Sequence, residues 1–276
     1  MKIGFIGGGN MAGAITGGVI ASGLCSKDEI CVCDKNEAVL AKYDREIKTS
    51  TNNRDAFFGD YIILAVKPFI LPKVLEEIAG MDKKEVEGKV FVSIAAGVTI
   101  DTIKQTLGSR AKVVRVMPNT PALVLEGMTV VAQCDSNVDQ AEFSAVVDIF
   151  NSVGTTEVMP ETMINTVTGV SGSSPAYVYM FIEAMADGAV KLGLPRKVAI
   201  QAAAQAVLGS AKMVLCSGEH PAQLKDNVCS PAGTTIEAVG VLEKSGFRGI
   251  IMNAMDACAQ KNRKFAQAYE RRKNER

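Results

Sequence analysis

The sequence predicts an α/β fold in two parts: a parallel sheet covered by helices over residues 1–159, followed by an all-α domain over residues 160–276. Three observations lead to this prediction. Short apolar runs alternate with amphipathic stretches through the first part. A glycine-rich turn follows the first apolar run. After Met159 the strand patterns stop, Pro160 marks the change, and long helical patterns take over.

The elements of the first part are predicted in order from their periodicity. Near-continuous apolar runs predict strands that are buried on both faces, as in a parallel sheet. These strands are residues 2–7, 29–34, 61–68, 89–97, 111–119, 128–134 and 155–159. Apolar residues at helical spacing predict the helices between them, which are residues 10–23, 36–43, 70–80, 99–107 and 139–153.

Two long helices are predicted in the second part, over residues 174–193 and 196–215. The second of them carries alanine on nearly every side and few charges, so we expect it to be buried all round. A short helical domain that buries such a helix is expected to interlock with a second copy. The sequence therefore predicts a homodimer or a higher homo-oligomer.

Composition excludes several classes of protein. Thirty basic residues balance thirty acidic ones, so no overall field favours nucleic acid or an anionic membrane. The uncharged stretch between Lys2 and Lys27 is too rich in glycine for a membrane helix or a signal peptide. The seven cysteines are scattered and never spaced C-x-x-C, which predicts a reducing cytoplasm and neither disulfides nor a metal site. Cys31 and Cys33 are expected on the same side of a strand, as small buried thiols.

The glycine-rich turn indicates a dinucleotide-binding, Rossmann-like domain. Gly7, Gly9 and Ala12 fit the pattern G-x-G-x-x-G/A directly after a strand and at the start of a helix. Gly7 allows a tight turn, Gly9 lets the backbone approach a pyrophosphate, and Ala12 lets helix and strand pack closely. The free N–H groups at the start of the helix then face the negative charge. A glycine-rich turn without a ligand is the alternative.

Other strand ends carry turns of the same kind, where a ligand of an open α/β sheet is expected. Asp34 ends the second strand and can accept from ribose hydroxyls, whereas Lys35 with Asn52 or Asn53 could accommodate a 2′-phosphate. We therefore expect both NADPH and NADH as cofactors. The candidate cofactor-binding residues are Ile6, Gly7, Gly8, Gly9, Asn10, Met11, Asp34, Asn52, Ala65, Val66, Lys67, Pro68, Ala95, Ala96 and Gly97.

The chain is poor in catalytic groups, which suits hydride transfer because the cofactor carries the difficult step. The single histidine, His220, excludes a Ser-His-Asp triad and is expected to begin a helix, since Pro221 follows it. Two Ser-Pro pairs, Ser174-Pro175 and Ser230-Pro231, are expected to begin helices. Free N–H groups there, with the hydroxyls of residues 234 and 235, could hold a small carboxylate. Plain helix caps without a ligand remain the alternative.

The segment DNVCSPAGTTIEAVGVLE, residues 226–243, is similar to the signature of the pyrroline-5-carboxylate reductases. The chain resembles this family over essentially its whole length. The segments FIGGGNMAGAI, AVKP, SIAAGVTI, RVMPNTPALV, GVSGSSPAYVYMFIEAMADG, GLPR and GEHPAQLKD occur in the family's order. Ala232 stands where many members have a second glycine, so we expect no left-handed backbone at this residue.

The resemblance implies reduction of Δ1-pyrroline-5-carboxylate to L-proline with NAD(P)H, the last step of proline synthesis. It implies that the substrate pocket is lined by Asn227, Val228, Ser230, Gly233, Thr234 and Thr235. We assign Thr235 as the candidate hydrogen-bonding or proton-relay group near the ring nitrogen, which makes it the candidate catalytic residue. The resemblance also implies an intertwined dimer built by the helical domain, and a place for Glu161 near the site.

Two other functions stay open at this point. A β-hydroxyacid dehydrogenase shares the two-domain layout, but it needs a lysine in the segment that reads TGVSGSSPAYVYM here, and this segment has none. A module that senses NAD(P) without turnover would also carry the glycine turn. The complete segment SPAGTT argues against such a module.

Overall fold

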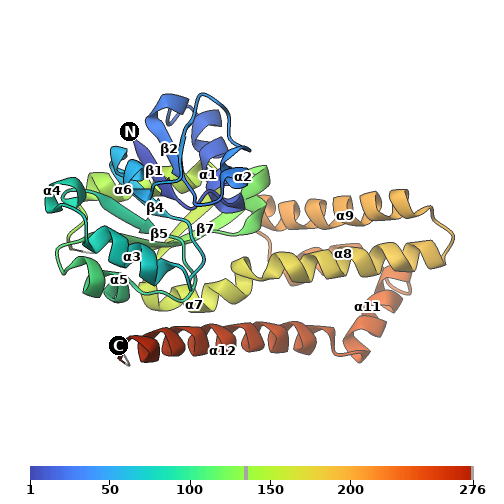
Figure 1. Ribbon diagram of the computed structural model, residues 1–276. Coiled ribbons are helices and arrows are strands. Elements are labelled where there is room, and N and C mark those ends of the chain that lie inside the picture. Colours follow the sequence, from blue (N-terminus) through green and yellow to red (C-terminus); the bar gives the residue numbers. More distant parts are fainter. Residues whose placement is uncertain (134–135, 275–276) are drawn as a thin grey trace. The chain divides into compact units, whose positions relative to one another are not determined.

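The computed structural model describes residues 1–133 and 136–274, and the chain divides into two compact units (Figure 1). Residues 1–173 and the described residues from Cys258 onward form the first unit, and Ser174–Ala257 form the second. The boundary expected at residue 159 divides the chain by type of element, whereas these units divide it by compactness. That boundary therefore stays a prediction.

A sheet of eight strands, counted over the described residues, forms the centre of the first unit, in the order β3-β2-β1-β4-β5-β6-β7-β8. Neighbouring strands are parallel except for β6 and β7. The chain leaves β1 toward β2 on one side and returns to β4 on the other, so the strand order reverses beside β1. The strands are β1 (Ile3–Ile6), β2 (Ile30–Cys33), β3 (Lys48–Ser50), β4 (Tyr61–Leu64), β5 (Val90–Ser93), β6 (Lys112–Met117), β7 (Gly127–Ala132) and β8 (Gly154–Met159).

The sheet differs from the prediction in two places. The sequence predicts a wholly parallel sheet, but β6 and β7 are antiparallel because the connection between them contains no crossover helix, only the 3₁₀ helix η3 (Thr120–Val124). The edge strand β3 is not predicted, since its three residues Lys-Thr-Ser carry no apolar run and are mostly exposed.

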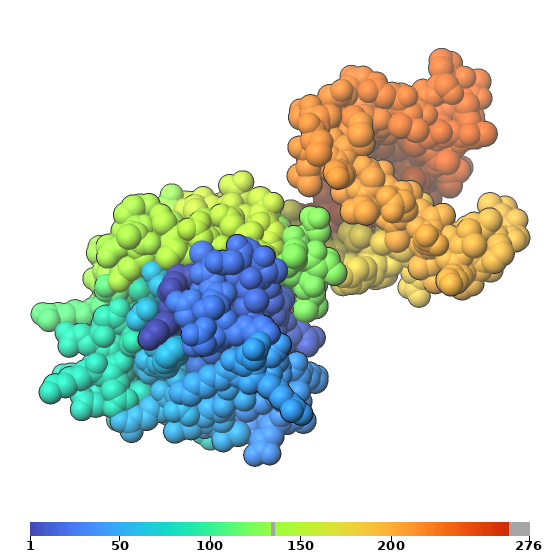
Figure 2. All heavy atoms as spheres, turned by 90° about the horizontal axis from the view of Figure 1, so that it is seen from above, coloured from blue at the N-terminus to red at the C-terminus, as the bar shows by residue number. Residues whose placement is uncertain are grey.

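Helices cover both faces of the sheet, as expected. On one face Phe5 packs in a buried cluster with Ile15 of α1 and Phe150 of α6. On the other face Ile62 packs with Leu75 of α3 and Ile103 of α5. In Figure 2 the described part of residues 1–173, blue to yellow-green, forms one compact mass of atoms. The helices are α1 (Asn10–Ala21), α2 (Glu37–Leu40), α3 (Leu71–Ala79), α4 (Lys83–Val86), α5 (Ile100–Leu107) and α6 (Gln140–Asn151).

The chain leaves the sheet through one short helical segment. It consists of the 3₁₀ helix η4 (Glu161–Met163), α7 (Ile164–Val167) and the π-helix η5 (Thr168–Gly172). Gly172 of the π-helix lies close to Met117 at the end of β6, because a Cβ placed on Gly172 would be 3.2 Å from the Met117 Cε. Short π-helical segments often occur at functional sites.

The second unit is helical throughout its described residues. Its elements are α8 (Ser174–Lys191), α9 (Arg196–Ser217), α10 (Pro221–Val228), α11 (Thr234–Lys244) and the first part of α12 (Phe247–Asn274). Helices α8 and α9 run side by side as a hairpin (Figure 1). In this unit the only buried hydrophobic side chains among the described residues are Ala186, Ala199 and Ala203.

Helix α9 is therefore not buried all round within a single chain, and that prediction is wrong for the monomer. Its exposed apolar side chains include Leu208 and Leu215, which are 57% and 84% exposed. Among the described residues, α9 is the one helix that is long and apolar enough to cross a membrane by length and composition, and only 11% of its apolar window is buried.

The buried thiols agree with the expectation for the second strand. Cys31 and Cys33 of β2 are both buried on one face of the sheet, and their Sγ atoms are 3.9 Å apart. The neighbouring Cys31 thiol and burial both raise the pKa of Cys33. Cys25 is buried as well, Cys216 is exposed, and Cys134 lies outside the described residues.

Candidate functional site

The glycine turn joins β1 to α1 at the point where the strand order reverses. Gly7 has a φ of 101°, and a Cβ atom there would lie 2.6 Å from the carbonyl oxygen of Ala65, so only glycine fits. Gly9, in contrast, has nothing within 4 Å of such a Cβ and is exposed. Gly9 is the N-cap of α1 and provides no side-chain cap. The N–H groups of Asn10 and Met11 are thus available to an anion, as a pyrophosphate requires.

Two side chains from later in the chain hold Gly8 in the middle of this turn. The Gly8 N–H donates to Asp34 Oδ2 at 2.8 Å, and the Tyr43 hydroxyl donates to the Gly8 carbonyl at 3.0 Å. Burial and the nearby Asp34 charge raise the pKa of Tyr43 to about 12, which keeps the phenol protonated as a donor. Tyr43 is a residue that the sequence analysis missed.

Three residues are expected around the adenosine end of the cofactor, and each has its own hydrogen-bond partner in the structure. Asp34 lies at the carboxyl end of β2, and its second oxygen accepts from the Asn36 N–H at 2.9 Å. Lys35 is exposed, and its Nζ donates to the Thr51 carbonyl at 3.1 Å. Asn52 is also exposed and caps the 3₁₀ helix η2 (Asn53–Phe58). Lys35 and Asn52 therefore lie near each other, where a 2′-phosphate could be held.

The structure contradicts Asn53, the alternative to Asn52 for holding a 2′-phosphate. The Asn53 side chain is buried, and its Nδ2 donates to Glu77 Oε2 at 2.9 Å. A buried amide that already has a carboxylate partner is not free to bind a phosphate.

The turns after β4 and β5 supply the remaining cofactor candidates. The Ala65 N–H donates to the Ile6 carbonyl at 2.8 Å, which fixes the start of the segment Ala65–Val66–Lys67–Pro68 against the glycine turn. The Lys67 side chain is exposed. Ala95, Ala96 and Gly97 follow β5, with a φ of 78° at Gly97. All fifteen cofactor candidates lie in the first unit, mostly at the carboxyl edge of the sheet.

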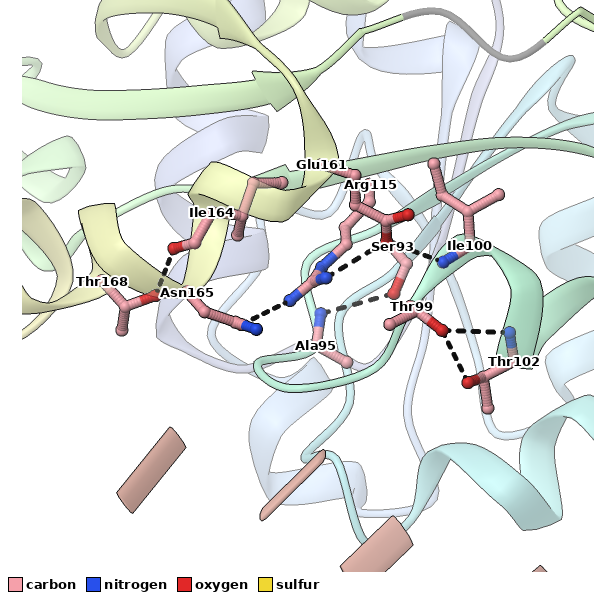
Figure 3. A network of polar contacts seen from close by, with 10 residues as sticks. All are labelled: Ser93, Ala95, Thr99, Ile100, Thr102, Arg115, Glu161, Ile164, Asn165 and Thr168. Atoms are coloured by element: carbon pink, nitrogen blue, oxygen red, sulfur yellow. Dashed lines mark hydrogen bonds and ion pairs between the residues drawn. The ribbon is translucent and has the colours of Figure 1, made fainter. Parts of the chain in front are cut away.

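A partly buried polar network lies beside the turn after β5 (Figure 3). Arg115 of β6 donates to Glu161 Oε1 and to Asn165 Oδ1, both at 3.1 Å. The same Glu161 oxygen accepts from the Ile100 N–H at 2.9 Å. Arg115 was not singled out from the sequence, although one cation inside the apolar run KVVRVM is a visible signal.

A second buried contact ties the end of β6 to the π-helix. Asn119 Nδ2 donates to the Ser171 carbonyl at 3.0 Å, and Asn119 Oδ1 accepts from the Met128 N–H at 2.9 Å. Both polar groups of the Asn119 amide are used, so this side chain holds the chain segments around the carboxyl end of β6 together.

The substrate candidates lie in the second unit, on α10, α11 and the turn between them. His220 is the N-cap of α10: its Nδ1 accepts from the Ala222 N–H at 3.2 Å, and Pro221 is the first helical residue. The prediction that His220 begins a helix is confirmed. Asn227 and Val228 end α10, and the Asn227 amide is bonded to Gln223 and more weakly to Glu219.

Ser230 to Gly233 form a β-turn, which corrects two expectations. The Gly233 N–H donates to the Ser230 carbonyl at 3.0 Å, so Ser230 opens the turn and does not cap α11. Ala232 has a φ of 55°, although no left-handed backbone was expected there. Proline at the second position and a positive φ at the third are the pattern of a type II turn. The other Ser-Pro pair behaves as expected, because Ser174 is the first residue of α8.

The turn leaves the start of α11 without a side-chain cap. Gly233 is the N-cap, and a Cβ there would lie 2.4 Å from the Ser230 Oγ, so a larger residue would have to displace the Ser230 hydroxyl. Thr234 and Thr235 are the first two residues of the helix, with Thr235 half-buried. Free N–H groups beside two hydroxyls can bind a carboxylate. No group of three or more His, Cys, Asp or Glu side chains that could hold a metal ion occurs in the described part of the chain.

Comparison with known proteins decides the family. Residues 161–265 match the family model for pyrroline-5-carboxylate reductase dimerisation, and residues 2–97 match that for coenzyme F420-dependent NADP oxidoreductases. A pyrroline-5-carboxylate reductase of Escherichia coli is 51% identical over 270 residues, which cover 97% of this chain and 99% of that protein. This chain belongs to the pyrroline-5-carboxylate reductase family. The family prediction made from the sequence is confirmed.

More distant pyrroline-5-carboxylate reductases agree. The Methanosarcina acetivorans protein is 42% identical over 267 residues, which cover 96% of this chain and 97% of that protein. A crystal structure of the Plasmodium falciparum pyrroline carboxylate reductase with NADP bound is 34% identical, has a TM-score of 0.86, and covers 96% of this chain and 98% of that chain. An Aquifex aeolicus prephenate dehydrogenase, at 15% identity and a TM-score of 0.52, shares the fold alone.

Membership in the pyrroline-5-carboxylate reductase family confirms three further predictions. The chain has an N-terminal nucleotide-binding sheet domain followed by a helical dimerisation domain, it is an oxidoreductase, and its family uses NAD(P)H. The family favours the reduction of pyrroline-5-carboxylate over the reaction of a β-hydroxyacid dehydrogenase. The roles of individual site residues stay predictions.

Proposed function

We propose that this protein reduces Δ1-pyrroline-5-carboxylate to L-proline with NADPH or NADH, the final step of proline biosynthesis. One observation carries the proposal: the uncapped N-terminus of α1 follows a turn at which only glycine fits at Gly7 and the backbone is open at Gly9. This arrangement is what a dinucleotide pyrophosphate needs. The family of the chain then specifies the imine as the substrate.

The residues of the first unit bind and orient the cofactor in this proposal. NAD(P)H, when bound, supplies the hydride that reduces C5 of the cyclic imine. The N–H groups of Asn10 and Met11 bind the pyrophosphate, and Asp34 accepts from the adenosine ribose. The exposed Lys35 and Asn52 leave room for a 2′-phosphate, which supports the use of both cofactors.

The turn and α11 bind the substrate. We assign the carboxylate of pyrroline-5-carboxylate to the free N–H groups at the start of α11 and to the Thr234 hydroxyl. The half-buried Thr235 hydroxyl is assigned to the ring nitrogen, which must carry a proton for C5 to accept a hydride readily. Asn227 and Val228 line the same pocket from the end of α10.

The test measures cofactor oxidation after addition of pyrroline-5-carboxylate. We expect turnover with both cofactors, and none with 3-hydroxyisobutyrate, the substrate of the alternative family. Thr235→Ala is expected to lower kcat/KM by about 10²-fold. Thr235→Ser keeps the hydroxyl and serves as the matched control, with activity close to that of the unchanged protein. Unchanged kcat/KM in Thr235→Ala would remove Thr235 from its role, and absence of turnover in the unchanged protein would refute the function.

The remaining assignments concern partners, location and domains. We propose that the helices of residues 160–276 form the substrate and dimerisation domain, and that α9 packs against a second chain and not in a membrane. The match of residues 161–265 to the dimerisation model supports this, since it includes all of α9. The balanced charge supports the absence of nucleic acid as a partner, and the free cysteines support a cytoplasmic location.

A further inference from the structure

We propose that Arg115 and Glu161 are positioning residues, which hold the turn Ala95–Gly97 in the shape that receives the nicotinamide half of the cofactor. This inference rests on the proposed function, because that function assigns the turn to the cofactor. Both residues are distant in sequence from the turn and are not among the candidate cofactor-binding residues. Figure 3 shows them together beside the end of β5.

Arg115 carries a charge that is almost wholly buried. Its side chain is only 3% exposed, and it projects from β6 next to β5, where Arg115 pairs with Ser93 in the strand register. A buried guanidinium is costly unless it is paired and hydrogen-bonded. Glu161 and Asn165, which follow the last strand of the sheet, provide these partners at 3.1 Å each. The position of the Glu161 carboxylate is therefore set by Arg115.

The Glu161 carboxylate is bonded in turn to the start of α5, just after the turn Ala95–Gly97. Glu161 Oε1 accepts from the Ile100 N–H at 2.9 Å, and Ile100 is the first residue of α5. The N-cap Thr99 uses its own hydroxyl for the Thr102 N–H, at 3.2 Å. Glu161 thus satisfies a helix-terminal N–H group that the local cap does not reach. An anion at a helix N-terminus also interacts favourably with the helix dipole.

The turn Ala95–Gly97 lies between the end of β5 and the start of α5, and the two ends are held differently. At one end the Ala95 N–H is 3.4 Å from the Ser93 Oγ, a long and weak contact. At the other end the start of α5 is held by Glu161. Gly97 has a φ of 78°, which allows the turn other conformations when its anchor is lost. The stronger anchor of the turn is therefore the Arg115–Glu161 pair.

The experiment compares Glu161→Ala, Glu161→Gln and Asn165→Ala. In the cofactor-free protein, hydrogen exchange of residues 95–102 is expected to be faster in Glu161→Ala. It should rise less in Glu161→Gln, whose carbonyl oxygen can still accept from both donors although the side chain lacks the charge that pairs with Arg115. Asn165→Ala removes the other partner of the same guanidinium and controls for loss of stability alone, so its exchange at residues 95–102 should not change.

Ligand binding supplies the second measurement. Glu161→Ala is expected to bind NADPH about tenfold more weakly, because the turn must be ordered when the cofactor binds. Adenosine 2′,5′-bisphosphate lacks the nicotinamide, and its affinity should be unchanged in every variant. Glu161→Leu fills the space of the side chain without an acceptor, and it should repeat the effects of Glu161→Ala.

Two results would overturn the inference. One is unchanged exchange at residues 95–102 in both Glu161→Ala and Glu161→Leu, and the other is an equal loss of affinity for NADPH and for the bisphosphate. If the unchanged protein failed to bind NADPH, the proposed function would fail instead. The exchange comparison needs no cofactor and would still test whether Glu161 holds the turn.

Discussion

At Gly8 a single residue shows how the nucleotide-binding turn is completed. Its N–H is bonded to Asp34 and its carbonyl to the Tyr43 hydroxyl, so neither polar group of the residue is left to a ligand. In the proposed site, the pyrophosphate is therefore expected at Gly9 and the first turn of α1. The pattern of glycines predicts the turn, but a contact between residues 8 and 43 leaves no periodic signal in the sequence.

Removal of the Tyr43 hydroxyl tests this contact. Tyr43→Phe keeps the ring but leaves the partly buried Gly8 carbonyl without its donor, which is expected to lower the free energy of unfolding by about 1 kcal/mol. A less rigid turn should also weaken NADPH binding by a few fold. The measurements are chemical unfolding and titration with NADPH. Tyr61 is the first residue of β4, at the end of the strand away from the glycine turn. Tyr61→Phe is therefore the matched control and should leave NADPH affinity unchanged.

The same phenol predicts a pH dependence. Its pKa of about 12 in the folded protein lies above the usual value for tyrosine, near 10, so the folded state retains the proton longer. The contribution of Tyr43 to stability is therefore complete below pH ~10 and is lost as pH rises toward about 12. A phenolate absorbance titration should show this late ionisation in the unchanged protein and lack it in Tyr43→Phe.

At the scale of elements, the turn between α10 and α11 contains a strained residue. Ala232 adopts a φ of 55°, a left-handed conformation that costs a residue with a Cβ about 1–2 kcal/mol. Glycine would remove this cost but would lose about 0.5–1 kcal/mol of backbone entropy on folding. Ala232→Gly is expected to raise the free energy of unfolding by about 0.5 kcal/mol, measured at a fixed protein concentration.

Ala232→Val provides the opposite change at the same site. A β-branched residue at a positive φ is more strained than alanine, so this variant should lose about 1 kcal/mol or more. Equal stability of the glycine, alanine and valine proteins would show that the turn does not hold this conformation in solution.

The existence of the elements could be largely predicted from the sequence, while their directions and limits could not. Apolar runs predict the buried strands, including β7, but they carry no information on direction. The antiparallel pairing of β7 with β6 was therefore missed. The polar edge strand β3 has no apolar run at all. Helix α2 ends at Leu40 because the chain continues with i→i−3 bonds from Lys42 and Tyr43, a local choice that periodicity does not report.

At the scale of the whole molecule, most apolar side chains of the second unit are not buried by the chain itself. Its apolar helices contribute only three alanines to the buried set of the described residues. Because large exposed apolar surfaces indicate association, we expect a homodimer or larger assembly at micromolar concentration. Leu208→Glu on α9 places a charge on this surface and is expected to shift the assembly toward the 29.2 kDa chain. Size-exclusion chromatography with light scattering measures the mass.

Val158→Glu supplies the control for that substitution. Val158 is 44% exposed on the edge strand β8, outside the segment that matches the dimerisation model. The mass of this variant should equal that of the unchanged protein. A single 29.2 kDa species for the unchanged protein would contradict the expected assembly.

How much of the candidate site could be predicted also depends on scale. Parallel strands end at one edge of a sheet, so the turns at Gly7, Asp34 and Ala95 could be grouped from sequence alone. The substrate candidates lie close together in the chain, so they could be grouped without knowledge of the fold. The contact of Arg115 with Glu161 depends on packing between β6 and the segment after the sheet, and only a structure shows it.

The buried thiols of β2 have a practical consequence. A reagent that modifies thiols can reach Cys31 and Cys33 only when β2 separates from its neighbours, whereas Cys216 is accessible in the folded chain. The rate of modification at the two buried positions thus reports how often the centre of the sheet opens. The protein carries, in its natural sequence, separate chemical probes for opening of the sheet and for accessibility of α9.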